Sequence, residues 1–174
     1  MKQLWFEQVP STIDIAKSLF NQPCEQGLIV VAKTQTAGRG QFERRFDDQP
    51  NQALLYSQVL YLTTLPNDCA YMIGCELRRF LAIQYQIDVE VKRPNDLYYQ
   101  GRKLAGILLE PQYLGEKLEG VIISIGLNVH GIPPSQPQAI CLQMIRKFPY
   151  DIACLASQLQ VWLANALSLK EPIQ

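Results

Sequence analysis

Charged side chains flank two turns in residues 92–110, KRPNDLYYQGRKLAGILLE. Lys92 stands just before the Pro-Asn-Asp sequence at 94–96, which ends a strand and forces a turn. Lys103 opens the apolar run that follows, so its ammonium group must reach either solvent or a polar cavity. Asp96 and Lys103 lie on opposite sides of a short hairpin, and both could reach one cleft. These charges suit an anionic ligand and a metal ion, whereas the alternative is a surface hairpin with solvated charges.

A glycine-rich segment is the second candidate for ligand contact. Gly38-Arg39-Gly40 follows the aliphatic run 27–32, and its glycines allow the backbone to approach a ligand closely. Its spacing is that of neither a Walker loop nor a dinucleotide fingerprint. The polar residues 41–52 that come next predict a long loop, of the kind that often covers an active site.

A hydroxyl pair, Ser11-Thr12, is predicted to begin a helix. Ser11 is a favourable N-cap residue, and Asp14 stands three residues later in an arrangement similar to a capping box. Hydroxyl groups at a helix N-terminus could also hold a polar group of a ligand. The sequence leaves both roles open.

Hydrophobic periodicity indicates the elements that must position these residues. Besides the hairpin in 92–110, the predicted strands cover residues 1–10, 27–32, 53–63, 88–92 and 118–128. The predicted helices begin at residue 11, run from about 68 to 84 and cover 152–169, whereas 139–147 is ambiguous. Strands partly joined as hairpins, with few helices, predict an α+β fold: a mixed, mostly antiparallel β-sheet with helices packed on one face. Without a dividing linker, residues 1–174 are expected to form a single domain.

Composition narrows the class of ligand. The 16 Lys+Arg balance 16 Asp+Glu, and this neutral charge argues against nucleic acid as a partner. Clustered cations on a neutral background favour a small anionic ligand. Five cysteines without a CxxC pair, and a single histidine, do not have zinc-site spacing and predict reduced thiols in a cytoplasmic protein. We find no signal peptide and no membrane span in the sequence.

Three blocks, in this order, resemble a known family. The stretch TQTAGRGQFERRF is similar to its glycine–arginine loop. Residues 92–110 resemble its most diagnostic segment, K-W-P-N-D followed by R-K-L-A-G-I-L, and VIISIGLNVH resembles its V-x-G-I-G-x-N-V strand. With Ser11-Thr12, these blocks resemble the biotin protein ligase family, whose catalytic module attaches biotin to carboxylase subunits. The resemblance covers residues 1 to about 170 and implies a fold like that of class II synthetases.

The resemblance implies a biotin-[acetyl-CoA-carboxylase] ligase that works in two steps. Biotin and Mg-ATP give biotinyl-5′-AMP and pyrophosphate, and a lysine of biotin carboxyl carrier protein then attacks the mixed anhydride. The implied cofactors are ATP and Mg²⁺, biotin is a substrate, and the carrier protein is the partner. A homodimer is left open.

The same resemblance implies roles for individual residues. Lys103 and Arg39 match catalytic positions. The positions that match the biotin pocket are Ser11, Thr12, Gln35, Gly38, Arg39, Gly40, Gln41, Lys103 and Gly106. The positions that match nucleotide contacts are Arg44, Phe46, Lys92, Asn95 and Asn128, and Asp96 matches the metal position. Such a reaction requires positioning and charge stabilisation, and no covalent enzyme intermediate.

The chain also departs from the family pattern. Arg93 and Phe46 stand where tryptophan is usual, Ile13 where asparagine is common, and Gln41 where arginine is common. The 174 residues are expected to contain neither an N-terminal DNA-binding domain nor a C-terminal barrel. Two alternatives stay open: a lipoate or octanoate ligase or transferase of the same fold, and a non-catalytic module that binds biotin or nucleotide.

Overall fold

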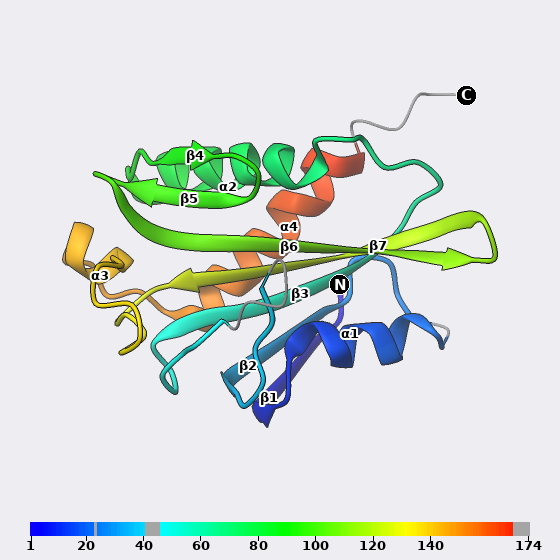
Figure 1. Ribbon diagram of the computed structural model, residues 1–174, viewed down its shortest axis with the longest axis horizontal. Helices are drawn as coiled ribbons and strands as arrows, with labels where there is room; N and C mark the ends of the chain where they lie inside the picture. Colours follow the sequence, from blue (N-terminus) through cyan, green and yellow to red (C-terminus); the bar gives the residue numbers. More distant parts are fainter. Residues whose placement is uncertain (23, 41–45, 169–174) are drawn as a thin grey trace.

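The computed structural model describes residues 1–22, 24–40 and 46–168. In chain order its elements are β1 (Gln3–Val9), α1 (Thr12–Phe20), β2 (Ile29–Gln35), β3 (Ala53–Tyr61), α2 (Cys69–Tyr85), β4 (Glu90–Lys92), β5 (Asp96–Tyr99), β6 (Arg102–Leu114), β7 (Lys117–Asn128), α3 (Leu142–Ile145) and α4 (Ile152–Ser168). The strands of the described chain form one sheet in the order β1-β2-β3-β7-β6-β5-β4 (Figure 1). β1 and β2 are parallel, and the other neighbouring pairs are antiparallel. The predicted α+β class and mixed, mostly antiparallel sheet are therefore confirmed.

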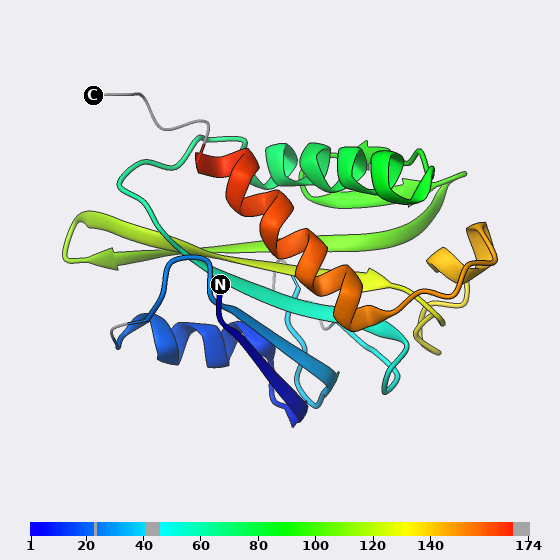
Figure 2. The same cartoon turned by 180° about the vertical axis from the view of Figure 1, so that it is seen from behind.

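Helices cover both faces of the sheet, which corrects the prediction that they all lie on one face. α2 and α4 pack over one face (Figure 2), where Ile29 and Val31 of β2 belong to the larger core. α1 packs over the other face, where Val30 joins Ile13 in a smaller core. Successive strand residues point to opposite faces. The aliphatic run 27–32 is therefore buried on both sides and does not indicate which face a helix covers.

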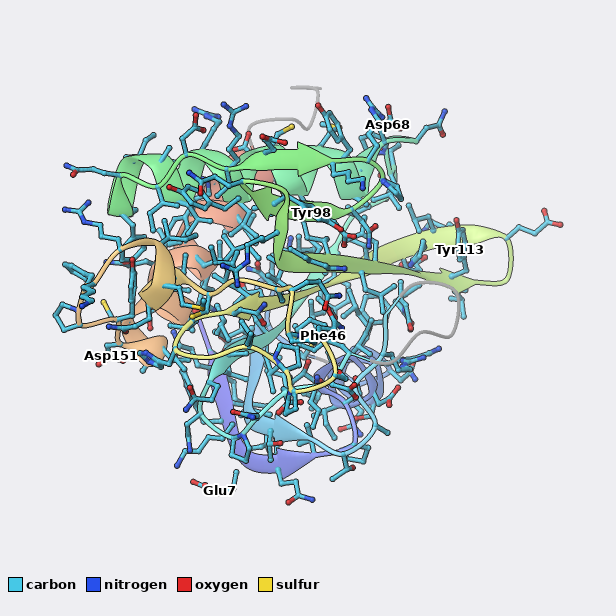
Figure 3. All side chains as sticks on the ribbon, turned by 60° about the vertical axis from the view of Figure 1, so that its left-hand side comes forward. Glu7, Phe46, Asp68, Tyr98, Tyr113 and Asp151 are labelled. Carbon is cyan, nitrogen blue, oxygen red and sulfur yellow. The ribbon has the colours of Figure 1, made fainter. Side chains whose placement is uncertain are left out.

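The predicted elements are found, with shifts at their ends. The strand predicted at 27–32 continues to Gln35, which becomes important for the site. The ambiguous stretch 139–147 contains the short helix α3. The turn after Leu114 joins β6 to β7, and Figure 3 shows Tyr113 on the part of this hairpin that projects beyond the rest of the sheet.

Two general features bear on the class of protein. No helix in the described part of the chain is long and apolar enough to cross a membrane. The five cysteines all lie among the described residues, and none of them is joined in a disulfide. The stability of the fold therefore depends on its packed core, in which residues such as Phe80, Leu81 and Ile123 are fully buried.

Candidate active site

One cavity of about 600 Å³ lies beside the N-terminus of α1, between β2 and the β5–β6 hairpin. β7 contributes Gly126 to its wall, and residues between 133 and 139 line another side. Of the site residues predicted from the sequence, all those that the structure describes line this cavity except Gly38. Gln41 and Arg44 lie outside the described residues.

The β5–β6 hairpin brings Asp96 and Lys103 together, so the prediction that both reach one cleft is confirmed. Lys103 Nζ lies 2.8 Å from Asp96 Oδ1. This oxygen is buried and receives no well-directed hydrogen bond from the described residues. The contact with Lys103 is therefore an ion pair, whose attraction depends on the distance between the charges. Gly106 lies opposite Asp96 in the strand register. A β carbon there would lie 3.4 Å from Asp96 Oδ1 and 3.6 Å from Lys103 Nζ, so a larger side chain would fill the space beside the pair.

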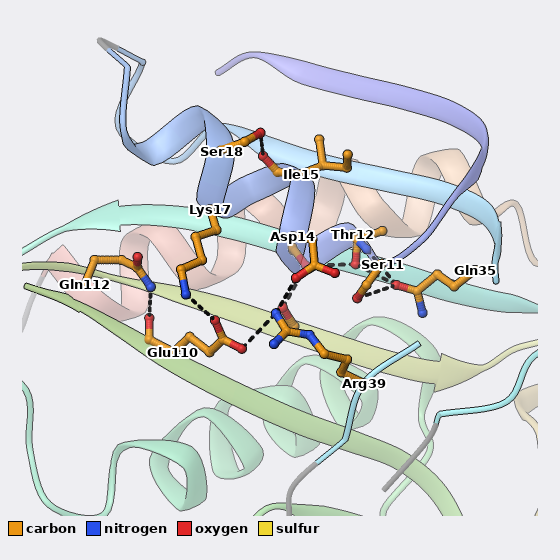
Figure 4. Close-up of polar contacts among 12 residues, drawn as sticks. Ser11, Thr12, Asp14, Ile15, Lys17, Ser18, Gln35, Arg39, Glu110 and Gln112 are labelled. Carbon is orange, nitrogen blue, oxygen red and sulfur yellow. Dashed lines mark hydrogen bonds and ion pairs between the residues drawn. The ribbon is translucent and has the colours of Figure 1, made fainter. Parts of the chain in front are cut away.

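The hydroxyl pair at the start of α1 is oriented by Gln35. Gln35 Oε1 accepts hydrogen bonds from the Thr12 N–H (2.7 Å), Thr12 Oγ1 (3.1 Å) and Ser11 Oγ (3.3 Å), as Figure 4 shows. Both hydroxyl residues are buried, and Ser57 Oγ donates to Thr12 Oγ1 at 2.8 Å. Ser11 occupies the N-cap position without a side-chain cap hydrogen bond. The hydroxyls therefore form a polar end of the cavity instead of capping the helix.

Arg39 lies at the edge of the cavity between two carboxylates. Its Nη2 atom contacts Asp14 Oδ1 and lies 3.0 Å from Glu110 Oε1 (Figure 4). Lys17 Nζ lies 3.8 Å from the other oxygen of Glu110. The capping box predicted between Ser11 and Asp14 is therefore wrong, because the Asp14 carboxylate pairs with a guanidinium instead of the helix backbone. The sequence did not indicate Asp14 or Glu110 as partners of Arg39.

The ring of Phe46 lies directly on the backbone of β7. A β carbon at Gly126 would lie only 2.4 Å from Phe46 Cζ. The Phe46 N–H donates to the Gly38 carbonyl at 2.9 Å, and a β carbon at Gly38 would lie 2.3 Å from Phe46 O. Gly38 is thus required for the close approach of two backbone segments. Figure 3 shows Phe46 between the strand that carries Tyr98 and the strand that carries Glu7.

Three further predicted residues line the cavity with different partners. Lys92 Nζ lies 5.0 Å from the centre of the Tyr98 ring. Asn95 Nδ2 donates to a backbone carbonyl of β6 at 2.6 Å. Asn128 Nδ2 donates to the Ile140 carbonyl at 3.0 Å. Both amide nitrogens therefore fix neighbouring segments of the backbone around the cavity.

Two acidic residues of the loop before β3 also bind the walls of the cavity. Thr34 Oγ1 donates to Asp48 Oδ2 at 2.8 Å, and the Gln35 N–H donates to Asp48 Oδ1 at 3.2 Å. Ser135 Oγ donates to Asp47 Oδ2 at 2.6 Å. Burial raises the pKa of Asp48 above its usual value, and the hydrogen bonds from Thr34 and Gln35 oppose this shift. Adjacent acids in a polar loop carry no sequence signal for such a role, so these two residues were missed.

Asp96 fits the metal position that the sequence predicted. Mg²⁺ is usually bound by one or two carboxylates together with substrate phosphates and water. The buried Asp96 Oδ1, which lacks a directed hydrogen-bond donor, is an acceptor of this kind. The described residues contain no group of three or more His, Cys, Asp or Glu side chains placed to hold a metal ion. A metal ion at Asp96 would therefore need ligand atoms from a substrate.

Comparison with known proteins gives consistent matches. Residues 5–128 match the model of the Biotin/lipoate A/B protein ligase family. The Bifunctional ligase/repressor BirA of Bacillus subtilis is 30% identical over 141 residues, which cover 79% of this chain and 43% of that protein. Biotin--protein ligase 1, chloroplastic, of Arabidopsis thaliana is 30% identical over 156 residues, which cover 83% of this chain and 40% of that protein. A structure of biotin protein ligase from Aquifex aeolicus in complex with biotin and ATP has a TM-score of 0.80 at 25% identity, over 96% of this chain and 70% of that chain.

The matches cover most of this chain but less than half of the curated relatives. The chain spans about two fifths of the length of the curated relatives it matches. The family model nevertheless covers residues 5–128, well over half of the 174 residues. This range includes the cavity residues from Ser11 to Asn128. The chain belongs to the Biotin/lipoate A/B protein ligase family.

Proposed function

We propose that this chain performs the chemistry of a biotin-[acetyl-CoA-carboxylase] ligase. It joins biotin to a lysine of biotin carboxyl carrier protein through biotinyl-5′-AMP, with ATP as the second substrate. The observation that carries the proposal is that one cavity holds the Lys103–Asp96 pair, Arg39, and the hydrogen bonds from Ser11 and Thr12 to Gln35. The names of the relatives, biotin protein ligases among them, and a similar structure with biotin and ATP support it.

The first step joins two anions. A carboxylate oxygen of biotin attacks the α-phosphorus of ATP, and pyrophosphate leaves with the electrons of the broken P–O bond. Lys103 and Arg39 offer positive charge to the carboxylate and the phosphate. Both cations are already fixed by carboxylates, Lys103 by Asp96 and Arg39 by Asp14 and Glu110. Cations that are held in place in this way are positioned to stabilise the negative charge of the transition state once the substrates displace part of their internal contacts.

The remaining residues of the cavity support the nucleotide. Asp96 would hold Mg²⁺, which supplies charge stabilisation at the phosphate oxygens when it is bound. Lys92 faces the same cavity and offers a further cation to the phosphates. The ring of Phe46, which rests on Gly126, offers a surface for the purine base.

The second step transfers biotin to the carrier protein. The lysine amine of the carrier attacks the carbonyl carbon of the mixed anhydride, AMP leaves, and the amine loses a proton. This step needs an exposed reaction centre and no enzyme nucleophile. The cavity is lined by no cysteine or histidine among the described residues, which is compatible with such direct transfer. The cysteines, none of which is joined in a disulfide, are compatible with a cytoplasmic reaction.

Formation of the adenylate tests the proposal directly. The purified protein is mixed with biotin, ATP and MgCl₂, and biotinyl-AMP is measured by mass spectrometry. Lys103→Met should remove most of the product, whereas Lys117→Met, a matched change at an exposed lysine of the same sheet, should leave it unchanged. Parallel samples with lipoate and octanoate separate the other acids. An adenylate with lipoate but not biotin, or biotin binding without any adenylate, would contradict the proposal in favour of one of the two alternatives.

A further inference from the structure

Asp48 connects the loop before β3 to the polar end of the cavity. Its carboxylate accepts a hydrogen bond from Thr34 Oγ1 at 2.8 Å and from the Gln35 N–H at 3.2 Å. Charge-assisted hydrogen bonds of this kind are about twice as strong as neutral ones. They act at the last residues of β2, where the strand no longer has a full set of sheet partners. The backbone of Gln35 is therefore positioned by a loop carboxylate.

The side chain of Gln35 transmits this position to α1. Its Oε1 atom is the common acceptor for the Thr12 N–H, Thr12 Oγ1 and Ser11 Oγ, at 2.7, 3.1 and 3.3 Å. One amide oxygen with three donors leaves little freedom for the side chain. A shift of the Gln35 backbone would therefore disturb both hydroxyls at once.

Asp47 makes the corresponding contact on the other side of the loop. Ser135 Oγ donates to Asp47 Oδ2 at 2.6 Å. Ser135 belongs to the loop that follows β7, and Pro133 and Gln136 of that loop line the cavity. Phe46, whose ring lies on β7, immediately precedes this pair of acids. Two adjacent carboxylates thus contact two different segments that contribute residues to the cavity, the end of β2 and the loop after β7.

We propose that Asp48 is a positioning residue for the polar end of the cavity, where Ser11, Thr12 and Gln35 would bind biotin. We propose that Asp47 has the same function for the nucleotide end, which lies beside Phe46 and the loop after β7. This inference rests on the proposed function, because biotin and ATP define the two ends. Neither carboxylate touches the reacting atoms. Each one acts through a partner, Asp48 through Gln35 and Asp47 through Ser135.

Calorimetric binding of biotin and of α,β-methylene-ATP tests the two assignments separately. Asp48→Ala should weaken biotin binding about tenfold, because it removes a charge-assisted contact, and leave the nucleotide dissociation constant within about twofold. Asp48→Asn keeps an acceptor oxygen and should recover part of the loss, to about threefold. Ser135→Ala should show the reverse pattern, with nucleotide binding weakened about threefold and biotin binding unchanged.

Controls make each outcome decisive. Asp88→Asn changes an exposed carboxylate that pairs with Arg78 and does not line the cavity, and it should alter neither constant. Should Asp48→Ala fail to fold, Thr34→Val removes one of the two contacts of the Asp48 carboxylate, leaves the Gln35 N–H contact in place, and should weaken biotin binding in the same direction by a smaller factor. Equal effects of Asp48→Ala on both ligands, or none on biotin, would overturn the assignment. A wild type that binds biotin without forming adenylate overturns only the proposed function, and one that binds no biotin overturns both.

Discussion

Removal of the Lys103 ammonium should separate the stability of the cavity from its chemistry. Lys103→Met keeps an apolar stem but leaves the buried Asp96 Oδ1 without the cation that lies 2.8 Å away. At that distance, two unit charges attract by about 1.5 kcal/mol in water and about 6 kcal/mol at an effective dielectric constant of 20. The two side chains are 34% and 24% exposed, so the pair is neither a surface pair nor a fully buried one. Between about 0.2–1 kcal/mol for exposed pairs and about 3–5 kcal/mol for broken buried pairs, we expect a loss of about 2 kcal/mol in the free energy of unfolding.

A second change, Asp96→Asn, distinguishes the two effects. Added to Lys103→Met, it removes the uncompensated charge and should restore about 1 kcal/mol of stability. Adenylate formation should fall about tenfold to a hundredfold in Lys103→Met, as expected for loss of a charged contact, and should not recover in the double variant. Urea unfolding and single-turnover formation of biotinyl-AMP measure the two quantities. Arg78→Met, at an exposed ion pair, should change neither. Near wild-type turnover in Lys103→Met, or recovered turnover in the double variant, would refute the proposed role of Lys103.

Three further predictions follow from individual contacts. Gly126→Ala places a methyl group 2.4 Å from Phe46 Cζ and should therefore displace the ring. The loss of about 1 kcal/mol of stacking should raise the KM for ATP about fivefold. An unchanged KM would count against the ring as a nucleotide contact. Gln35→Leu leaves three donors without their acceptor and should lower the free energy of unfolding, measured by urea unfolding, by about 2 kcal/mol. Gln35→Glu keeps an acceptor oxygen and should cost less. Equal costs for the two variants would show that the shared acceptor is unimportant. Burial is the main cause that raises the pKa of Tyr85 from 10.0 to about 12. The folded chain therefore keeps a proton that the unfolded chain loses, and Tyr85 should contribute a fall of about 1 kcal/mol in the free energy of unfolding between pH 10 and pH 12, with partial exposure discounted. Tyr85→Phe should reduce the total fall by that amount without abolishing it, because burial also raises the pKa values of Tyr56, Tyr61 and Tyr150.

Local topology explains why the contact between Asp96 and Lys103 was predictable from the sequence. Asp96 and Lys103 belong to one hairpin, so turn residues and strand alternation alone bring them together. Strand alternation did not predict that α1 covers the opposite face of the sheet from α2 and α4, because β2 is buried on both faces and its apolar run has no polar side. A strand of this kind reveals that it is central but not which helix covers which face.

The residues that the sequence did not indicate as part of the site make contacts between segments that are distant in the chain. Glu110 lies far from Arg39 in the sequence, and the pairing depends on where β6 passes the loop after β2. Asp48 is one of several acids in a polar loop, and its role appears only when the loop folds back against Thr34 and Gln35. Residue types thus predicted which groups gather around the cavity, whereas the groups that hold them in place required the tertiary structure.

The described cations of the cavity that we assign to substrate binding already have partners within the protein. Arg39 contacts two carboxylates, Lys103 contacts one, and Lys92 lies near the face of the Tyr98 ring. This arrangement avoids buried charge without compensation in the absence of substrate. Anionic substrates must then compete with the internal partners, so that only the difference between the two environments contributes to affinity. For Lys103 the competition involves Asp96, the proposed metal position. A cation held by Asp96 would weaken the attraction between that carboxylate and the Lys103 ammonium, and so make the ammonium available to the reacting anions.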